Sequence, residues 1–216
     1  MADQPYVPSG ASILLGTSNP AKQETLRWLL EGLPLSPVTP SQLGLQSIPE
    51  EEGDTHESIA RTKALDWSRS ASMLAIASDG GLLLPALASN WESRYTHRFA
   101  GQEADNARRL EYLLELMQPF QGDQREASWV EAVAVANQDG VLASWQLTGA
   151  TGVISDGRGI VPPESGFWAF SVWYFPHLGK TYNQLSLEDR EALDDHWVSL
   201  RRLVQSFFLR ILDPGV

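Results

Sequence analysis

Apolar residues recur along the chain in two periods, and these periods predict interleaved strands and helices. The first apolar run, residues 13–15, has the composition of a buried strand. After it, leucines recur at helical spacing from Leu26 to Leu33, while Asn19 and Pro20 are typical of an N-cap and a first helical position. We therefore expect a strand, a short polar turn and a helix at this end of the chain.

Two further helices and a strand are expected before residue 120. The second helix begins after Thr55, a typical N-cap residue, and runs through Ser68. An apolar strand over residues 73–78 follows and ends at Asp79. A third helix is expected over residues 105–117, and the residues on its apolar face are Ala107, Leu110, Leu114 and Met117.

The remaining pattern decides the fold class. Residues 127–149 predict a β-hairpin with Asp139-Gly140 in its turn. The last helix is expected to turn Trp197, Leu200, Val204, Phe207 and Ile211 inward. Because helices and strands interleave but the hairpin is antiparallel, we expect an α/β fold with a mixed twisted central sheet flanked by helices. We assign residues 1–216 to a single domain, with residues 1–10 as a loose N-terminal extension.

Composition and charge narrow the function classes. The formal net charge of −11 argues against a broad surface for nucleic-acid polymers, which clustered Lys and Arg would have to provide. A small anionic ligand is compatible with this charge if cations converge locally or a metal ion bridges the repulsion. No apolar run approaches the ~18 residues of a membrane span, and the polar opening is no signal peptide, so a cytoplasmic protein without a membrane partner is expected.

The cysteine content and the histidine spacing predict no metal site and no cysteine nucleophile. The chain has no cysteine, which excludes disulfides, thiolate zinc sites and cysteine nucleophiles. The four histidines show no metal-ligand spacing: His56, His97, His177 and His196.

The segment GTSNPAK, residues 16–22, has the chemistry of an anion site. A helix start presents unpaired N–H groups with a partial positive charge, where a phosphate group can bind. Lys22 could add a full charge, and Thr17 and Asn19 could add hydrogen bonds. Alternatively, Asn19 only caps the helix and Lys22 is solvated.

Two acidic segments suggest a metal ion near that site. Residues 50–53, EEEG, place carboxylates in a turn before the second helix, and Asp79 follows an apolar strand and precedes Gly80. Ligands of open α/β sheets collect at strand ends, and hard oxygen ligands together with phosphate oxygens suit Mg²⁺. The alternatives are a solvated acidic turn and a turn-forming aspartate.

Lys63 falls on the buried side of the second helix, among Ile59, Ala60, Ala64 and Trp67. An inward lysine must extend its amine to water, pair with a carboxylate or meet an anion.

In this order, the segments resemble the inosine triphosphate pyrophosphatase family, which removes deaminated purine nucleotides. TSNPAK resembles the family's Thr-Gly-Asn-x-x-Lys loop, and EEGDTHESIARTKA resembles Glu-Thr-Gly-x-Thr-Phe-x-Glu-Asn-Ala-x-x-Lys-Ala. SDGGL resembles the family's Asp-Asp-Ser-Gly-Leu segment, and THRFAG resembles its loop Ser-Ala-Arg-Tyr-Ala-Gly. GATGVI, Gly166-Phe167 and the GKT of residues 179–181 follow in the family's order, so the similarity covers nearly the whole chain.

The resemblance implies roles for particular residues. Glu51 and Asp79 would bind Mg²⁺, and Asp79 would also activate the attacking water. The substrate-binding residues would be Thr17, Ser18, Asn19, Lys22, Lys63, Gly80, Phe167, Arg190 and His196. The reaction would be attack on the α-phosphorus of a nucleoside triphosphate, giving a monophosphate and pyrophosphate. A cleft between two lobes and a homodimer are also implied.

Departures from the family pattern keep two alternatives open. Ser78 and Gly80 replace an aspartate and a serine, and the base-pocket tyrosine and aspartate read Ala169 and Phe170. Arg190 replaces a lysine. The residues that in the family bind the phosphates and the metal ion are thus largely kept, while those that recognise the base are changed. The alternatives are a non-catalytic nucleotide-binding relative and a hydrolase of a different phosphorylated metabolite.

Overall fold

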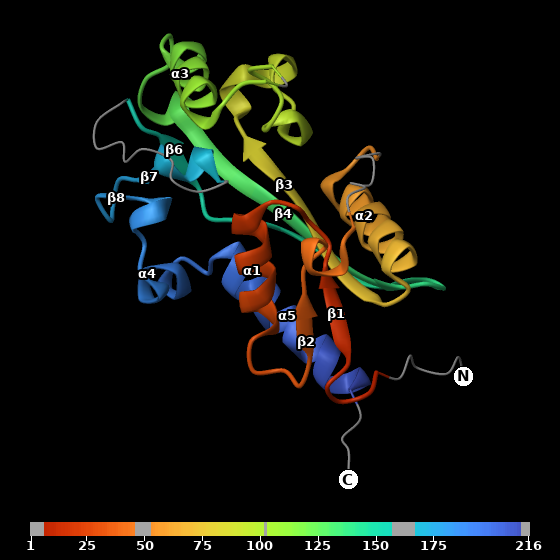
Figure 1. The fold of residues 1–216 in the computed structure, drawn as a ribbon. Helices are drawn as coiled ribbons and strands as arrows, with labels where there is room; N and C mark the ends of the chain where they lie inside the picture. The colour runs from red at the N-terminus through yellow and green to blue at the C-terminus, as the bar shows by residue number, and fades with distance from the viewer. Residues whose placement is uncertain (1–6, 46–52, 102, 157–166, 213–216) are drawn as a thin grey trace. The chain divides into compact units, whose positions relative to one another are not determined.

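The computed structural model of the chain describes residues 7–45, 53–101, 103–156 and 167–212 (Figure 1). The chain divides into two compact units. The first comprises Met1–Asp79, Glu131–Leu147 and Trp197–Val216, and the second comprises Gly80–Val130 and Thr148–His196. The mixed α/β class is confirmed, and the chain has two lobes as the resemblance implied. The assignment to a single domain stays a prediction.

The first unit is built on parallel strands with a hairpin beside them. Strand β1 (Ser12–Leu15) pairs in parallel with β2 (Ser36–Val38) and with β3 (Leu74–Leu83). Next to β3 comes β4 (Glu126–Asn137), which also pairs with β5 (Gly140–Thr148). The helices of this unit are α1 (Pro20–Leu30), α2 (His56–Ala71) and α5 (His196–Ile211), whose first residue belongs to the second unit. A 3₁₀ turn lies at Ser41–Leu43. The predicted hairpin and the inward face of the last helix are confirmed.

The second unit holds antiparallel strands and short helices. Its strands β6 (Gly152–Ile154), β7 (Trp173–Phe175) and β8 (Lys180–Thr181) continue the order from β4. Its helices are α3 (Asn106–Met117) and α4 (Leu187–Ala192). Its 3₁₀ helices are Pro85–Asn90, Ser93–Tyr95, Gly122–Arg125, Trp168–Ser171 and Tyr182–Gln184. In the described parts of the chain, no helix combines the length and apolarity needed to cross a membrane.

Local capping chemistry sets the start of the two helices that matter most for the site. At α1, the Asn19 Oδ1 accepts hydrogen bonds from the N–H groups of Ala21 (2.9 Å) and Lys22 (3.4 Å), and Pro20 occupies the first helical position. At α2, Thr55 and Ser58 form a reciprocal capping box with two bonds of 3.0 Å. Both predicted helix starts are confirmed.

Two predictions, the end of one strand and the buried face of one helix, were wrong. Strand β3 does not end at Asp79 but continues to Leu83. Helix α3 buries Leu110, Leu113 and Met117, whereas Ala107 is exposed and Leu114 is half-buried. The buried face is therefore rotated by about one residue from the predicted one.

Part of the predicted N-terminal extension is attached to the first unit. Residues 1–6 lie outside the described residues, but Val7 is buried and its N–H donates to the Ile211 carbonyl at 3.0 Å. The Gly10 N–H likewise donates to the Pro34 carbonyl at 2.7 Å. Residues 7–10 are therefore attached to the first unit by backbone hydrogen bonds and by burial of an apolar side chain.

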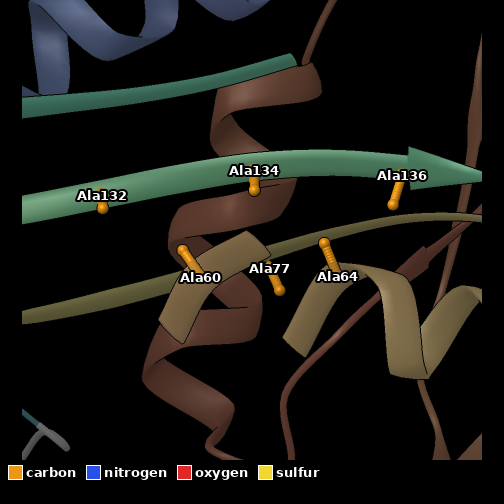
Figure 2. Packing of buried hydrophobic residues seen from close by; sticks show 6 residues of the cluster. All are labelled: Ala60, Ala64, Ala77, Ala132, Ala134 and Ala136. Atoms are coloured by element: carbon orange, nitrogen blue, oxygen red, sulfur yellow. The ribbon is translucent and has the colours of Figure 1, made fainter. Parts of the chain in front are cut away.

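A layer of alanines lies between α2 and the strands β3 and β4 (Figure 2). Its six members are all fully buried: Ala60, Ala64, Ala77, Ala132, Ala134 and Ala136. Side chains alternate across a strand, so Ala132, Ala134 and Ala136 share one face of β4, and Asp79 shares the face of β3 that carries Ala77. Because the side chains of this layer are methyl groups, α2 can approach the strands closely there. His56 and Lys63 of α2 reach Asp79 of β3.

Candidate active site in the first unit

The turn after β1 is shaped by hydrogen bonds among its own residues. The Asn19 N–H donates to the Thr17 Oγ1 (3.2 Å), and the Gln23 Nε2 donates to the Thr17 carbonyl (2.8 Å). Ser18 is exposed. Gly16 has no room for a side chain, because an added Cβ would lie 2.9 Å from the Trp67 Cδ1. The turn is thus a preformed loop at a helix N-terminus, as predicted, and Asn19 serves as its cap.

Lys22 stands in the first turn of α1, where a positive charge opposes the helix dipole. That first turn contains no acidic residue. The Lys22 Nζ lies 4.0 Å from the Glu131 Oε1, and Glu131 in β4 is fully buried. A lysine at this position gains nothing from the helix dipole, and the Glu131 carboxylate is a charged partner that it meets.

Asp79 is buried and is held on both carboxylate oxygens by residues of α2. The Lys63 Nζ donates to Oδ1 at 3.1 Å, and the His56 Nδ1 lies 2.6 Å from Oδ2. Exposed fractions are 8% for Asp79, 9% for Lys63 and 5% for His56. The inward orientation predicted for Lys63 is confirmed, and its partner is a carboxylate.

The environment of Asp79 keeps it ionised. Burial raises the pKa of its carboxyl group and is the largest single influence, but several others oppose it. The hydrogen bond with His56 and the charges of Lys22, Lys63 and His56 together bring the pKa below its ordinary value of 3.8. At neutral pH Asp79 is therefore an anionic oxygen donor that also feels the charge of Lys22.

This lowered pKa predicts how acid affects folding. A carboxyl group whose pKa is lower in the folded state stabilises the protein above its unfolded pKa, and the contribution disappears as the pH falls through the folded pKa. We expect the wild type to have a larger free energy of unfolding than Asp79→Asn, and this margin should be constant near neutral pH. It should shrink as the pH drops below 3.8. Urea unfolding of both proteins at a series of pH values measures this margin, and a margin that grows in acid would contradict the assignment.

Three predicted site residues lie together in the second unit. Phe167 stacks on Phe170 with ring centroids 4.8 Å apart, and the Arg190 guanidinium lies over the Tyr182 ring at 4.8 Å. His196 is buried, with its ring centroid 6.0 Å from that of Tyr182. The three residues thus belong to one aromatic cluster, and their contact with a substrate stays a prediction.

Two other predictions concern the acidic turn and the glycines after Asp79. Glu51 lies outside the described residues. Gly80 follows Asp79 within β3, and at Gly81 the closely approaching group is the Ser93 backbone, since an added Cβ would lie 1.9 Å from its carbonyl oxygen. The close approach at Gly81 is therefore made by the backbone of the chain itself.

Sequence reasoning missed His56 and Glu131. His56 was dismissed because no second metal ligand lies at a regular spacing from it, yet its partner is 23 positions away in the sequence. Glu131 interrupts an otherwise apolar strand, VEAVAVA, and such an interruption could have marked it. Within the described ranges, no group of three or more His, Cys, Asp or Glu residues is arranged to hold a metal ion.

Comparisons with known proteins identify a family and relatives that cover most of the chain. The Ham1 family model matches residues 13–206. A dITP/XTP pyrophosphatase of Halorhodospira halophila is 32% identical over 197 residues, which cover 89% of this chain and 95% of that protein. The dITP/XTP pyrophosphatase of Thermus thermophilus is 29% identical over 198 residues, 92% of each chain. The Ham1 protein structure from Staphylococcus aureus has a TM-score of 0.71 at 26% identity and covers 92% of this chain and 98% of its own. The HAM1 protein structure from Coxiella burnetii, at 24% identity and a TM-score of 0.74, shares the fold over 93% of this chain and 99% of its own.

Proposed function

The chain belongs to the Ham1 family, and on this premise we propose that it is a nucleoside triphosphate pyrophosphatase. Its substrates would be triphosphates of deaminated purines, the class to which the dITP and XTP of its relatives' names belong. The products would be a nucleoside monophosphate and pyrophosphate.

One observation carries this proposal: a buried, ionised carboxylate lies under the influence of two lysines within the first unit. Lys63 contacts Asp79 directly, and the charge of Lys22 lowers the pKa of the same carboxyl group. Lys22 also stands in the first turn of α1, directly after the turn that follows β1. A purely structural ion pair would need only one cation, whereas phosphoryl chemistry needs cations for the phosphates and an anion for a metal ion or a water.

The donors present fit a divalent cation such as Mg²⁺. Mg²⁺ is usually held by one or two carboxylates while substrate phosphates and water complete its coordination. Asp79 supplies one buried, ionised oxygen donor, and Glu51 is the second ligand that we propose. When bound, the cation would neutralise phosphate charge and lower the pKa of a nearby water.

The chain's own residues have separable tasks in this reaction. The turn at residues 16–22 and Lys22 would bind the triphosphate tail, and Lys63 would stabilise the negative charge that develops on the leaving pyrophosphate. Asp79 would orient the attacking water toward the α-phosphorus. In the second unit, the cluster that contains Phe167, Arg190 and His196 would bind the base. A homodimer and a cytoplasmic location complete the proposal and are supported by the family resemblance and by the composition.

The test is release of pyrophosphate from ITP, XTP, dITP and the standard nucleotides, with and without Mg²⁺. We expect Mg²⁺-dependent release with a preference for the deaminated purines. Turnover of another phosphorylated compound instead would overturn the substrate class. Tight binding of a nucleotide without any turnover would replace the enzyme by a nucleotide-binding protein.

A further inference from the structure

His56 has a position and a contact that the proposed reaction does not yet use. It is the first residue of α2, directly after the Thr55 capping box, and it is 5% exposed. Its Nδ1 lies 2.6 Å from the Asp79 Oδ2, which is shorter than the 3.1 Å between the Lys63 Nζ and Oδ1. His56 and Lys63 are seven positions apart, two helical turns, so both project from the same side of α2. Between them they hold the two oxygens of one carboxylate.

The two contacts do different things for Asp79. Lys63 supplies a full positive charge, which by itself offsets much of the cost of burying the carboxylate. The terminal torsion of an aspartate has a broad energy minimum, so a single contact leaves the plane of the carboxylate free to rotate. A second contact on the other oxygen fixes that plane. A carboxylate oxygen accepts hydrogen bonds, so in the 2.6 Å contact with the Asp79 Oδ2 we assign the His56 Nδ1 as the donor.

We propose that His56 is a positioning residue: its Nδ1–H fixes the Asp79 carboxylate in the orientation that binds the divalent cation. This inference rests on the proposed function for the identity of the cation. His56 also stands where the resembling family pattern has a phenylalanine, which has no such donor. Residues that support a metal ligand in this way typically contribute about 10–100-fold to metal affinity.

A structural role is the competing explanation, and suitable variants separate the two. His56→Asn keeps an N–H donor at the same number of bonds from the backbone as Nδ1. His56→Gln places its donor one bond farther away, and His56→Phe keeps a ring of similar size without a donor. Glu57→Gln is the matched control, because Glu57 is the next residue of α2 and its carboxylate accepts from the Ser144 hydroxyl at 2.6 Å.

The primary measurement is Mn²⁺ affinity without nucleotide, from the electron paramagnetic resonance signal of free Mn²⁺ at one fixed pH. We expect His56→Phe to weaken Mn²⁺ binding about 10–100-fold. His56→Asn should retain most of the affinity, His56→Gln should fall closer to the phenylalanine variant, and Glu57→Gln should bind as the wild type does. Equal affinity of wild type and His56→Phe, equal loss in the asparagine and phenylalanine variants, or no Mn²⁺ binding by the wild type would each overturn the proposal.

Two further readouts keep the test independent of folding and of the proposed function. Long-range ¹H–¹⁵N spectra of the wild type should show the proton of the His56 ring on Nδ1, and a proton on Nε2 alone would overturn the assignment even if every variant failed to fold. Pyrophosphate release by the wild type is measured alongside. If the wild type releases none but His56→Phe still loses Mn²⁺ affinity, then the proposed function fails while the role of His56 stands.

Discussion

Asp79→Asn is expected to eliminate nearly all pyrophosphate release while the chain still folds. Asparagine keeps the size of the side chain but removes the charge of a buried group that Lys63, His56 and Lys22 all influence. Residues that merely support a metal ligand contribute about 10–100-fold, so the loss of the ligand itself should exceed about 100-fold. The measurement is the initial rate of pyrophosphate release at saturating Mg²⁺ and substrate.

The control for this prediction is Asp139→Asn, an identical change at an exposed residue in the turn between β4 and β5. It should leave the rate unchanged. Circular dichroism and urea unfolding show whether Asp79→Asn is folded. A folded Asp79→Asn protein that retains a rate near that of the wild type would place the chemistry elsewhere.

Lys63→Met should reduce both stability and activity. Methionine preserves much of the apolar stem, but it leaves Asp79 buried without the full positive charge that now lies 3.1 Å from Oδ1. Breaking a buried pair by removing one partner costs about 3–5 kcal/mol, and we expect the lower end because His56 remains in contact with Asp79. The rate of pyrophosphate release should also fall, because Lys63 is proposed to stabilise the departing pyrophosphate. Urea unfolding and steady-state kinetics measure the two effects.

The double variant Lys63→Met/Asp79→Asn distinguishes an uncompensated charge from a simple packing defect. If the cost comes from the buried carboxylate, then neutralising Asp79 should restore part of the stability that Lys63→Met loses. Additive losses in the double variant would point to packing instead. Lys180→Met is the control, because the ion pair of Lys180 with Asp189 is partly exposed and exposed pairs contribute little to stability.

Local signals in the sequence were sufficient for the helix starts and for the direction of Lys63. Asn19 with Pro20, and Thr55 with Ser58, act through neighbours within a few residues, so their effect can be read from the sequence. The inward direction of Lys63 follows from helical periodicity alone. The identity of its partner does not, because Asp79 is brought there by the packing of α2 against β3.

The predictions that failed depended on partners distant in sequence. The apolar run of residues 73–78 was expected to form a strand that ends at Asp79, which two glycines follow. In the structure the Leu82 N–H donates to the Thr96 Oγ1, and the Ser93 backbone packs against Gly81. The segment that follows β3 thus supplies the contacts that keep it extended. His56 was missed for a similar reason, since only the folded chain reveals that its ring meets a carboxylate.

The residues proposed to bind the base are where the sequence departs most from the family pattern. Ala169 and Phe170 are both buried in the structure, and Phe170 contacts Phe167, Trp173 and Tyr182 through its ring. Such a cluster offers stacking surface and few hydrogen-bond donors, so discrimination between purines would depend on the few polar groups beside it, such as Arg190.

The alanine layer under α2 limits which amino-acid substitutions this protein can accept during evolution. A buried alanine can become smaller only as glycine, which weakens a helix or a strand, and every other replacement adds volume. Added volume would push α2 away from β3 and lengthen the contacts that His56 and Lys63 make with Asp79. Substitutions at these six positions should therefore impair the site without touching any of its residues, so the layer should accept few neutral mutations even though its side chains carry no chemistry.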